Sequence, residues 1–420
     1  MKRLFAFFAV VLLLSFGFVS SPRAASEMDI LLKKLVEKNV LTQDEANAIK
    51  KETSEEVKQQ QEEAKKQQEV VKKEVTEDVK KSVADWIPKW VRNTNVSGDL
   101  RLRYEYEKTT GKVARNRAIY RYRISFDNKV TDWAKVGLRL ASGGSDPRST
   151  NQTFNDTFSS KPVNIDLAFA ELKFFDALKI YGGKIPNPIF SPWDLLWDTD
   201  INPEGASFVV DFSPFYGNVS FWILDEYKDS SLDPYMVPLQ IGVAPKFGDF
   251  FLKAAATGYF FGNVKGNKLD FSAGTNSTDA DGNLIYYYNS VAGALEAGVY
   301  DLMPGIGVER LALFGEMVYN PDPDEIGWMA GLKIGAKKMP ERFGQWEFIY
   351  NYRYLERDAW LDTFPDSNAF NGATNVKGHE FIFRFGLAKN TDLTFDFYSM
   401  EQVDGNENQI VGEADINFKF

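Results

Sequence analysis

Pairs of arginines stand two residues apart in two early segments of the chain, Arg101 with Arg103 and Arg121 with Arg123. Residues two apart in an extended strand point to the same face of a sheet. With three later basic residues they form one predicted interior wall: Arg101, Arg103, Arg121, Arg123, Arg139, Lys173 and Lys179. Burying so many cations in a dry core would be prohibitive. This face is therefore predicted to be hydrated, with a mild preference for anions.

Residues 185–204 combine apolar and acidic side chains in a way that an ordinary exposed loop does not favour. We expect this segment to fold back into the interior, so that its apolar residues anchor it and its carboxylates lie across from the arginines. The predicted constriction residues are Trp193, Asp194, Trp197, Asp198, Asp200 and Glu204. Opposed charges at a constriction screen solutes by size and charge. The alternative is a loop that caps the outer rim.

The elements that would position these side chains are strands, because apolar and polar residues alternate from residue 94 to the C-terminus. The runs approach the roughly 9–11 residues that a tilted strand needs to cross a bilayer. Sixteen strands are predicted, at 95–107, 114–128, 131–142, 163–175, 177–184, 205–213, 217–227, 236–246, 249–262, 285–301, 305–320, 326–338, 343–355, 376–389, 391–402 and 408–420.

The connections between these strands alternate between short turns and long polar loops, which is typical of an outer-membrane barrel. A β-structure can span lipid only as a closed barrel, since every backbone polar group must be paired internally. The predicted fold class is all-β, a 16-stranded antiparallel transmembrane β-barrel over residues 94–420, preceded by a short α-helical or coiled-coil segment. Sixteen strands enclose a water-filled lumen.

Aromatic residues are expected on the lipid-facing wall, because no apolar core is expected inside the barrel. The residues assigned to this wall are Trp133, Trp222, Trp328, Trp346, Tyr350, Tyr352 and Tyr354. The last strand ends on Phe420. A terminal aromatic on an amphipathic strand resembles the signal that the barrel-assembly machinery reads, so Phe420 is the predicted assembly signal.

The N-terminal region is predicted to contain a targeting signal followed by helices. Residues 1–25 have the positive start, apolar stretch and small residues of a secretory signal peptide. Residues 26–90 are predicted to form a periplasmic helical segment, in which Thr42 and Glu45 fit a capping box. Val57, Ala64 and Val71 fall at heptad spacing beside polar d positions, so a coiled coil and a solvated single helix both remain open.

The composition excludes several classes of chemistry. The chain has no cysteine, which excludes disulfide scaffolds and cysteine-ligated metals. Its net charge of -10 argues against nucleic acid as a partner. Asp279, Asp281 and Asn283 have the opening spacing of a calcium loop but no glutamate at the twelfth position, so no metal or cofactor is expected.

Two classes of protein are alternatives to a channel. A barrel enzyme, a protease or lipase, would depend on His379, the single histidine, which has no convincing catalytic neighbour in the sequence. A surface structural or adhesive barrel would need loops that fill the lumen, and the long loops contain little apolar sequence.

Several motifs resemble the putative porin family of Gram-negative outer membranes: GDLRLRYE at 98–105, DPRSTNQT at 146–153, YGGKIPNP at 181–188 and WDTDINPEG at 197–205. Residues 31–52 resemble the helical N-terminal region of that family. The resemblance implies a 16-stranded porin in the cell outer membrane, passive diffusion of ions and small hydrophilic solutes, and, by analogy with better-known porins, a homotrimer. It does not identify the solute.

Overall fold

A computed structural model describes residues 23–38, 40–52, 55, 62, 88–228 and 231–420. The chain divides into two compact units, Met1–Pro88 and Lys89–Phe420. The predicted signal peptide lies mostly outside the described residues, as do the heptad positions Val57, Ala64 and Val71.

The first unit contains helix α2, Arg23–Glu37, and a second helical stretch at 43–52. The backbone N–H of Thr42 donates to Glu45 Oε2 at 2.8 Å, and the N–H of Glu45 donates to Thr42 Oγ1 at 3.3 Å. These reciprocal bonds form the predicted capping box, which begins the second helix. Among the described residues, no helix is both long and apolar enough to cross a membrane.

The second unit opens with a helical turn, α4 (Lys89–Arg92), and continues as one antiparallel sheet. Its strands are β1 (Thr94–Thr109), β2 (Arg115–Lys129), β3 (Ala134–Ala141), β4 (Gln152–Thr153), β5 (Asn164–Phe175), β6 (Leu178–Lys184), β7 (Glu204–Phe212), β8 (Phe215–Ile223), β9 (Tyr235–Val243), β10 (Lys246–Phe247), β11 (Phe250–Gly262), β12 (Ser290–Met303), β13 (Val308–Asn320), β14 (Glu325–Gly335), β15 (Trp346–Leu355), β16 (Val376–Ala388), β17 (Thr391–Gln402) and β18 (Asn408–Lys419). Two short 3₁₀ turns, η1 (Asp156–Phe158) and η2 (Pro304–Ile306), lie between strands.

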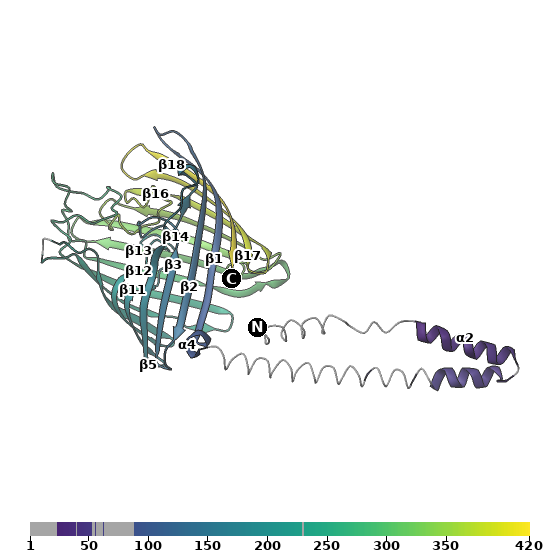
Figure 1. Ribbon diagram of the computed structural model, residues 1–420. Coiled ribbons are helices and arrows are strands. Elements are labelled where there is room, and N and C mark those ends of the chain that lie inside the picture. Colours follow the sequence, from purple (N-terminus) through teal and green to yellow (C-terminus); the bar gives the residue numbers. More distant parts are fainter. Residues whose placement is uncertain (1–22, 39, 53–54, 56–61, 63–87, 229–230) are drawn as a thin grey trace. The chain divides into compact units, whose positions relative to one another are not determined.

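The sheet closes on itself, because β1 pairs with both β2 and β18 (Figure 1). Leu102, for example, lies opposite Tyr120 on β2 and Ile416 on β18. The two-residue strands β4 and β10 extend β2 and β11 locally, and the remaining strands form a closed barrel of sixteen. The predicted fold class is confirmed.

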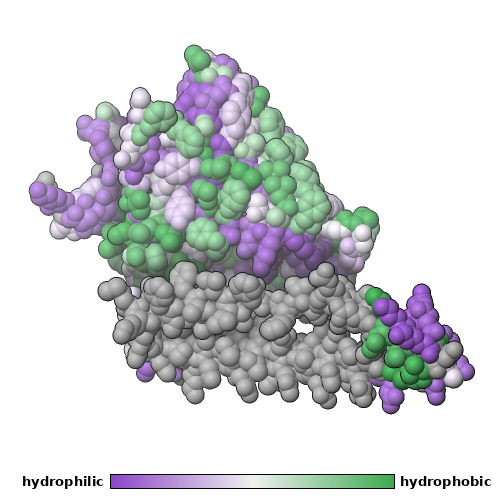
Figure 2. All heavy atoms as spheres, turned by 45° about the vertical axis from the view of Figure 1, so that its right-hand side comes forward, coloured by the Kyte–Doolittle hydropathy of each residue, from purple (hydrophilic) through white to green (hydrophobic). Residues whose placement is uncertain are grey.

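The two faces of the wall follow the alternation of the sequence. On β1, Leu102, Tyr104 and Tyr106 are exposed, whereas Arg103 and Glu105 between them are buried. Hydrophobic side chains form large patches on the visible barrel wall, and the projecting loop tips are hydrophilic (Figure 2). The outer wall thus presents the apolar surface that lipid requires.

Trp222 is an exception to the predicted outer belt. Trp133 and Trp328 are exposed on the outer face, but Trp222 is only 1% exposed. On β8 the exposed residues are Phe215, Val219, Phe221 and Ile223, so the alternation turns Trp222 inward. Its Nε1 donates to Ser207 Oγ on the neighbouring strand at 3.1 Å.

An apolar cluster occupies part of the barrel interior, which corrects the expectation that no core exists there. The inner faces of β8 to β16 supply one side of it, including Trp222, Met236, Tyr259, Phe314 and Ile349. The long connections 185–203, 263–289 and 356–375 supply the other side, including Leu195, Leu196, Trp197, Leu284, Tyr288, Trp360, Leu361 and Phe364. Burial of these side chains is a hydrophobic gain that orders the three connections against the wall.

Candidate functional site

Residues 185–203, here named the inner loop, connect β6 to β7 and contact side chains on the inner face of the wall. The backbone of Phe190 exchanges two hydrogen bonds with the Gln240 amide of β9, at 2.8 and 3.0 Å. Lys333 Nζ on β14 donates to the carbonyl of Pro192 at 2.9 Å. Ser191 Oγ donates to Glu316 of β13 at 3.0 Å. The loop is therefore attached to strands far around the barrel from its own ends.

Trp197 anchors the centre of the inner loop in the apolar cluster. Its ring lies 5.8 Å from that of Trp222 and 5.7 Å from that of Trp360, both in edge-to-face contact. Its Nε1 donates to Tyr259 Oη at 3.1 Å. Edge-to-face pairs of this kind add to the burial of aromatic surface.

Arg353 of β15 holds three carboxylates from three separate elements. Its guanidinium donates to Asp194 of the inner loop at 2.8 Å, to Asp366 of connection 356–375 at 3.0 Å, and to Glu380 of β16. Glu380 also accepts from the indole N–H of Trp193 at 3.0 Å. A charge-assisted cluster of this kind fixes the loop to the wall. Arg353 therefore serves as the counter-ion of all three carboxylates.

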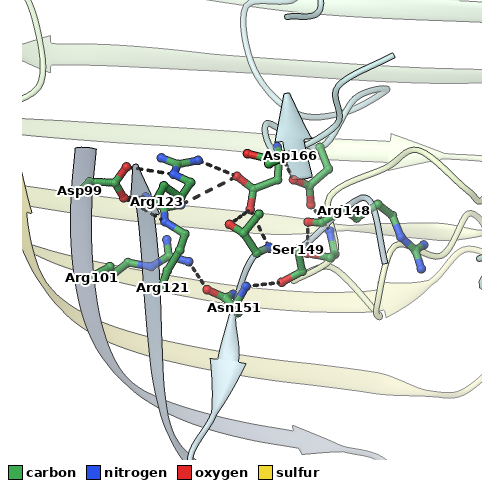
Figure 3. A network of polar contacts seen from close by, with 12 residues as sticks. Asp99, Arg101, Arg121, Arg123, Arg148, Ser149, Asn151 and Asp166 are labelled. Atoms are coloured by element: carbon green, nitrogen blue, oxygen red, sulfur yellow. Dashed lines mark hydrogen bonds and ion pairs between the residues drawn. The ribbon is translucent and has the colours of Figure 1, made fainter. Parts of the chain in front are cut away.

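Two arginines of β2, Arg121 and Arg123, meet the other end of the inner loop, and Figure 3 shows them beside Asp99 of β1. Arg121 and Arg123 both donate to Asp99, and Arg123 Nη1 donates to Asp200 Oδ1 at 3.0 Å. Asp200 Oδ2 also accepts from the backbone and hydroxyl of Thr150, at 3.1 and 3.0 Å. The inner loop is thus attached to opposite parts of the wall at its two ends.

The segment between β3 and β5 contributes to the same region. Arg101 Nη2 donates to Asn151 in this segment (Figure 3). Arg148 donates to the carbonyl of Asp362 at 3.0 Å, which links the segment to connection 356–375. Arg103 forms a bidentate pair with Asp415 of β18, at 2.7 and 2.8 Å, and also pairs with Glu413.

These elements enclose a cavity of about 150 Å³, here named the eyelet. Its charged lining comprises five guanidinium and six carboxylate side chains: Arg101, Arg103, Arg121, Arg148, Arg384, Asp194, Asp198, Asp200, Asp366, Glu380 and Asp396. Arg148 also lines a wider cavity of about 710 Å³, together with residues at the loop ends of β1, β16, β17 and β18. A small charged cavity therefore adjoins a wider cavity on the long-loop side, and the two share Arg148.

The three aspartates of the inner loop differ in the direction in which their surroundings shift the pKa. Burial raises the pKa of Asp194 well above its ordinary value, and the nearby carboxylates of Asp366 and Glu380 add to this effect. Burial likewise raises the pKa of Asp198, with a further contribution from Asp200. Burial opposes the charge of Asp200 too, but the neighbouring arginines outweigh it and lower the pKa of Asp200 to about 2.

Six of the predicted residues do not line the eyelet. Trp197 packs in the apolar cluster, and Glu204 pairs with Lys184 at 2.7 Å at the start of β7. Arg123 and Arg139 bind the carboxylates of Asp200 and Asp166. Lys173 and Lys179 lie near the short turn between β5 and β6, half-exposed, and pair with Asp176 and Glu171.

Other residues of the eyelet were not predicted. Glu380, Arg384 and Asp396 of the eyelet, and Arg353 that binds Glu380, lie on inner positions of β15 to β17, and the alternation of those strands could have identified them. Arg148, Asn151 and Asp366 lie in connections without regular alternation. Their positions depend on how the loops fold, so the sequence held no signal for them.

Comparison with known proteins decides the family. The sequence profile of a family described as "Putative porin" matches residues 108–290 and 306–420, more than half of the chain. This chain belongs to that porin family. The predicted family is therefore confirmed, and with the closed barrel it makes the protein an outer-membrane porin, a channel for solutes.

Two solved structures illustrate what the chain is similar to. The porin is similar to OprB of Pseudomonas putida in its high-pH structure, with 12% identity and a TM-score of 0.52 over 79% of this chain and 95% of that chain. A triple mutant of the Rhodopseudomonas blastica porin has 10% identity and a TM-score of 0.46 over 78% of this chain and 100% of that chain. At this identity, the likeness to OprB shows a shared fold. No curated protein matches the chain.

Proposed function

We propose that ions and small hydrophilic solutes cross this porin by passive diffusion through the eyelet, and that the inner loop sets its width. One observation carries the proposal: a cavity of about 150 Å³ is bounded by the inner loop and by inner residues of β1, β2, β16 and β17. Charged groups make up most of its lining, so it stays hydrated. Conductance of the purified protein in a planar lipid bilayer tests the proposal, and a protein that inserts without conducting would refute it.

We further propose that the porin carries out no catalysis. His379 lies on the exposed outer face of β16, where its Nδ1 is 2.9 Å from Tyr350 Oη and its ring stacks against Phe381. A histidine that faces lipid among aromatic rings is not positioned to activate a water-borne substrate. Hydrolysis assays with wild-type protein and a His379→Ala variant should therefore show no activity in either.

The remaining expectations follow from the topology. Both ends of the barrel chain lie at the short-turn side, which supports a periplasmic location for the helical N-terminal unit. Phe420 exchanges two backbone hydrogen bonds with Gly98, at 2.8 and 3.0 Å, and so completes the β1–β18 seam. This position supports its role as the signal for the barrel-assembly machinery.

A homotrimer is proposed by analogy with other porins.

Ion preference near neutral pH is proposed to be weak. The expected preference for anions rested on basic positions of the early strands, but carboxylates and guanidinium groups both line the eyelet. Because the eyelet has similar numbers of positive and negative groups, it attracts cations and anions to a similar degree. The reversal potential in a potassium chloride gradient measures the ratio of potassium to chloride permeability.

Acidification is expected to shift the porin toward anions. Burial raises the pKa of Asp194 and Asp198, so both lose their charge as the pH falls, whereas Asp200, with a pKa of about 2, stays ionised. Between about pH 9 and about pH 4 the reversal potential should therefore move toward the chloride equilibrium potential.

The matched variants for this titration are Asp194→Asn with Asp198→Asn, in which most of the shift should disappear. Asp279→Asn serves as the control, because Asp279 lies in an exposed turn and accepts hydrogen bonds from the N–H groups of Asp281 and Asn283. A reversal potential that moves toward potassium on acidification would contradict the assignment of these carboxylates to the conduction path.

A further inference from the structure

Four of the five basic groups of the eyelet come from elements that supply none of its carboxylates, whereas the fifth, Arg384, lies on β16 with Glu380. Arg101, Arg121 and Arg148 belong to β1, β2 and the segment between β3 and β5. The carboxylates belong to the inner loop, connection 356–375, β16 and β17. A volume of about 150 Å³ corresponds to the space of roughly five water molecules in the liquid. Any solute that enters is therefore within reach of both signs of charge.

The acidic side of the eyelet keeps unused hydrogen-bond acceptors. Glu380 is only 1% exposed. Its Oε2 accepts from Trp193, Asn351 and Arg353, but its Oε1 has no hydrogen-bond partner among the described residues. Asp396 Oδ1 is buried and without a partner in the same part of the chain. Two carboxylate side chains that line one cavity thus each keep an oxygen without a hydrogen-bond partner among the described residues.

The basic side keeps an unused donor. Arg101 Nη2 donates to Asn151, and its Nη1 lies 3.7 Å from Asp415. Its Nε is buried and lacks a partner within the described part of the chain. Buried polar groups without partners are rare and cost free energy, unless water or a ligand satisfies them.

We propose that the eyelet is a binding site for small zwitterions, that is, solutes with an ammonium group and a carboxylate, such as free α-amino acids. The ammonium group binds at Glu380 and Asp396, and the carboxylate binds at Arg101. A simple ion of either sign is attracted by one set of groups and repelled by the other, whereas a zwitterion is attracted by both. This inference rests on the proposed function, because it takes the eyelet as the conduction path.

Glycine and its uncharged isomer glycolamide test the proposal, since they have the same atoms and nearly the same size. Uptake into liposomes that contain the purified full-length porin should be several-fold faster for glycine, and glycine uptake should saturate. Replacing both carboxylates, Glu380→Gln with Asp396→Asn, should reduce glycine uptake to the rate of glycolamide while glycolamide uptake stays similar. Equal uptake of the two isomers by the wild-type porin would overturn the proposal.

A matched control removes two carboxylates of the inner wall outside the eyelet, Asp127→Asn with Glu171→Gln, and should keep the preference for glycine. Glu171 lies 3.2 Å from Lys135, near the short-turn end of β5. If the Glu380 and Asp396 double variant does not fold, Arg101→Gln tests the same site from the other side and should also abolish the preference. An unchanged preference in the folded eyelet variants would overturn the proposal.

Potassium chloride conductance distinguishes a failure of the zwitterion-site proposal from a failure of the proposed channel function. A porin that conducts potassium chloride but does not distinguish glycine from glycolamide refutes only the zwitterion site. A porin that conducts neither ions nor solutes refutes the proposed function itself.

Discussion

Deletion of residues 190–200 is expected to raise the single-channel conductance several-fold. These residues include Asp194, Asp198 and Asp200, which border the eyelet, and Trp197, which holds the loop inside the barrel. Removing them joins the eyelet to the space that the loop occupies, so the narrowest cross-section widens. Lys184 and Glu204 are directly paired across β6 and β7, so the residues left at 185–189 and 201–203 suffice to close the hairpin.

The control for this deletion is a shortened tip between β1 and β2, in which an Asn-Gly turn replaces residues 110–114. This tip is exposed, and a Cβ at Gly111 would meet no atom within 4 Å. Conductance of the control should equal that of the wild type. If the deletion folds into a barrel, as judged by heat-modifiable gel mobility, and its conductance does not rise, the inner loop does not limit the channel.

Replacement of Arg353 by glutamine is expected to destabilise the barrel by about 3–5 kcal/mol, because it leaves several buried carboxylates without their cation. Asp194, Asp366 and Glu380 each accept a hydrogen bond from Arg353, and the pairs join the inner loop and connection 356–375 to the wall. The loop should also become mobile, so single-channel records should show frequent steps between conductance levels. Urea-unfolding midpoints and bilayer recordings measure the two effects.

Lys377→Gln provides the matched control for Arg353. Lys377 forms an ion pair with Glu401 at 3.4 Å, and both side chains are partly exposed. Water screens such a pair, so its loss should cost only about 0–1 kcal/mol and leave the conductance steady. Equal stability of the Arg353→Gln variant and the wild type would show that the three carboxylates do not depend on Arg353.

The strands were predictable from the sequence because the environment imposes their pattern. Lipid outside and water inside require apolar and polar residues to alternate, and this period of two is visible without any tertiary information, as at Leu102 and Arg103. The predicted strands agree with the structure to within a few residues for most of the wall. The main differences are at β8 and β12, where the predicted ends at residue 227 and residue 285 fall within connections.

The positions of side chains inside the barrel were less predictable, because they depend on how the loops fold rather than on the strands. Trp222 was assigned to the lipid face, since aromatic residues favour that face, but Trp197 of a distant segment packs against its ring from inside. The amphipathic composition of residues 185–204 did indicate a loop that folds inward. It did not indicate that connections 263–289 and 356–375 fold inward as well, where Asp358 and Asp362 bond the two together.

A single cysteine in the eyelet tests most directly whether solutes pass beside the inner loop. The chain has no native cysteine, so Thr199→Cys, which lines the eyelet, provides one reactive thiol. Modification with a bulky thiol reagent should block most of the potassium chloride conductance, and reduction should restore it. Val113→Cys, at an exposed loop position, is the control and should conduct normally after modification. Undiminished conductance after complete modification of Thr199→Cys would contradict the placement of the conduction path in the eyelet.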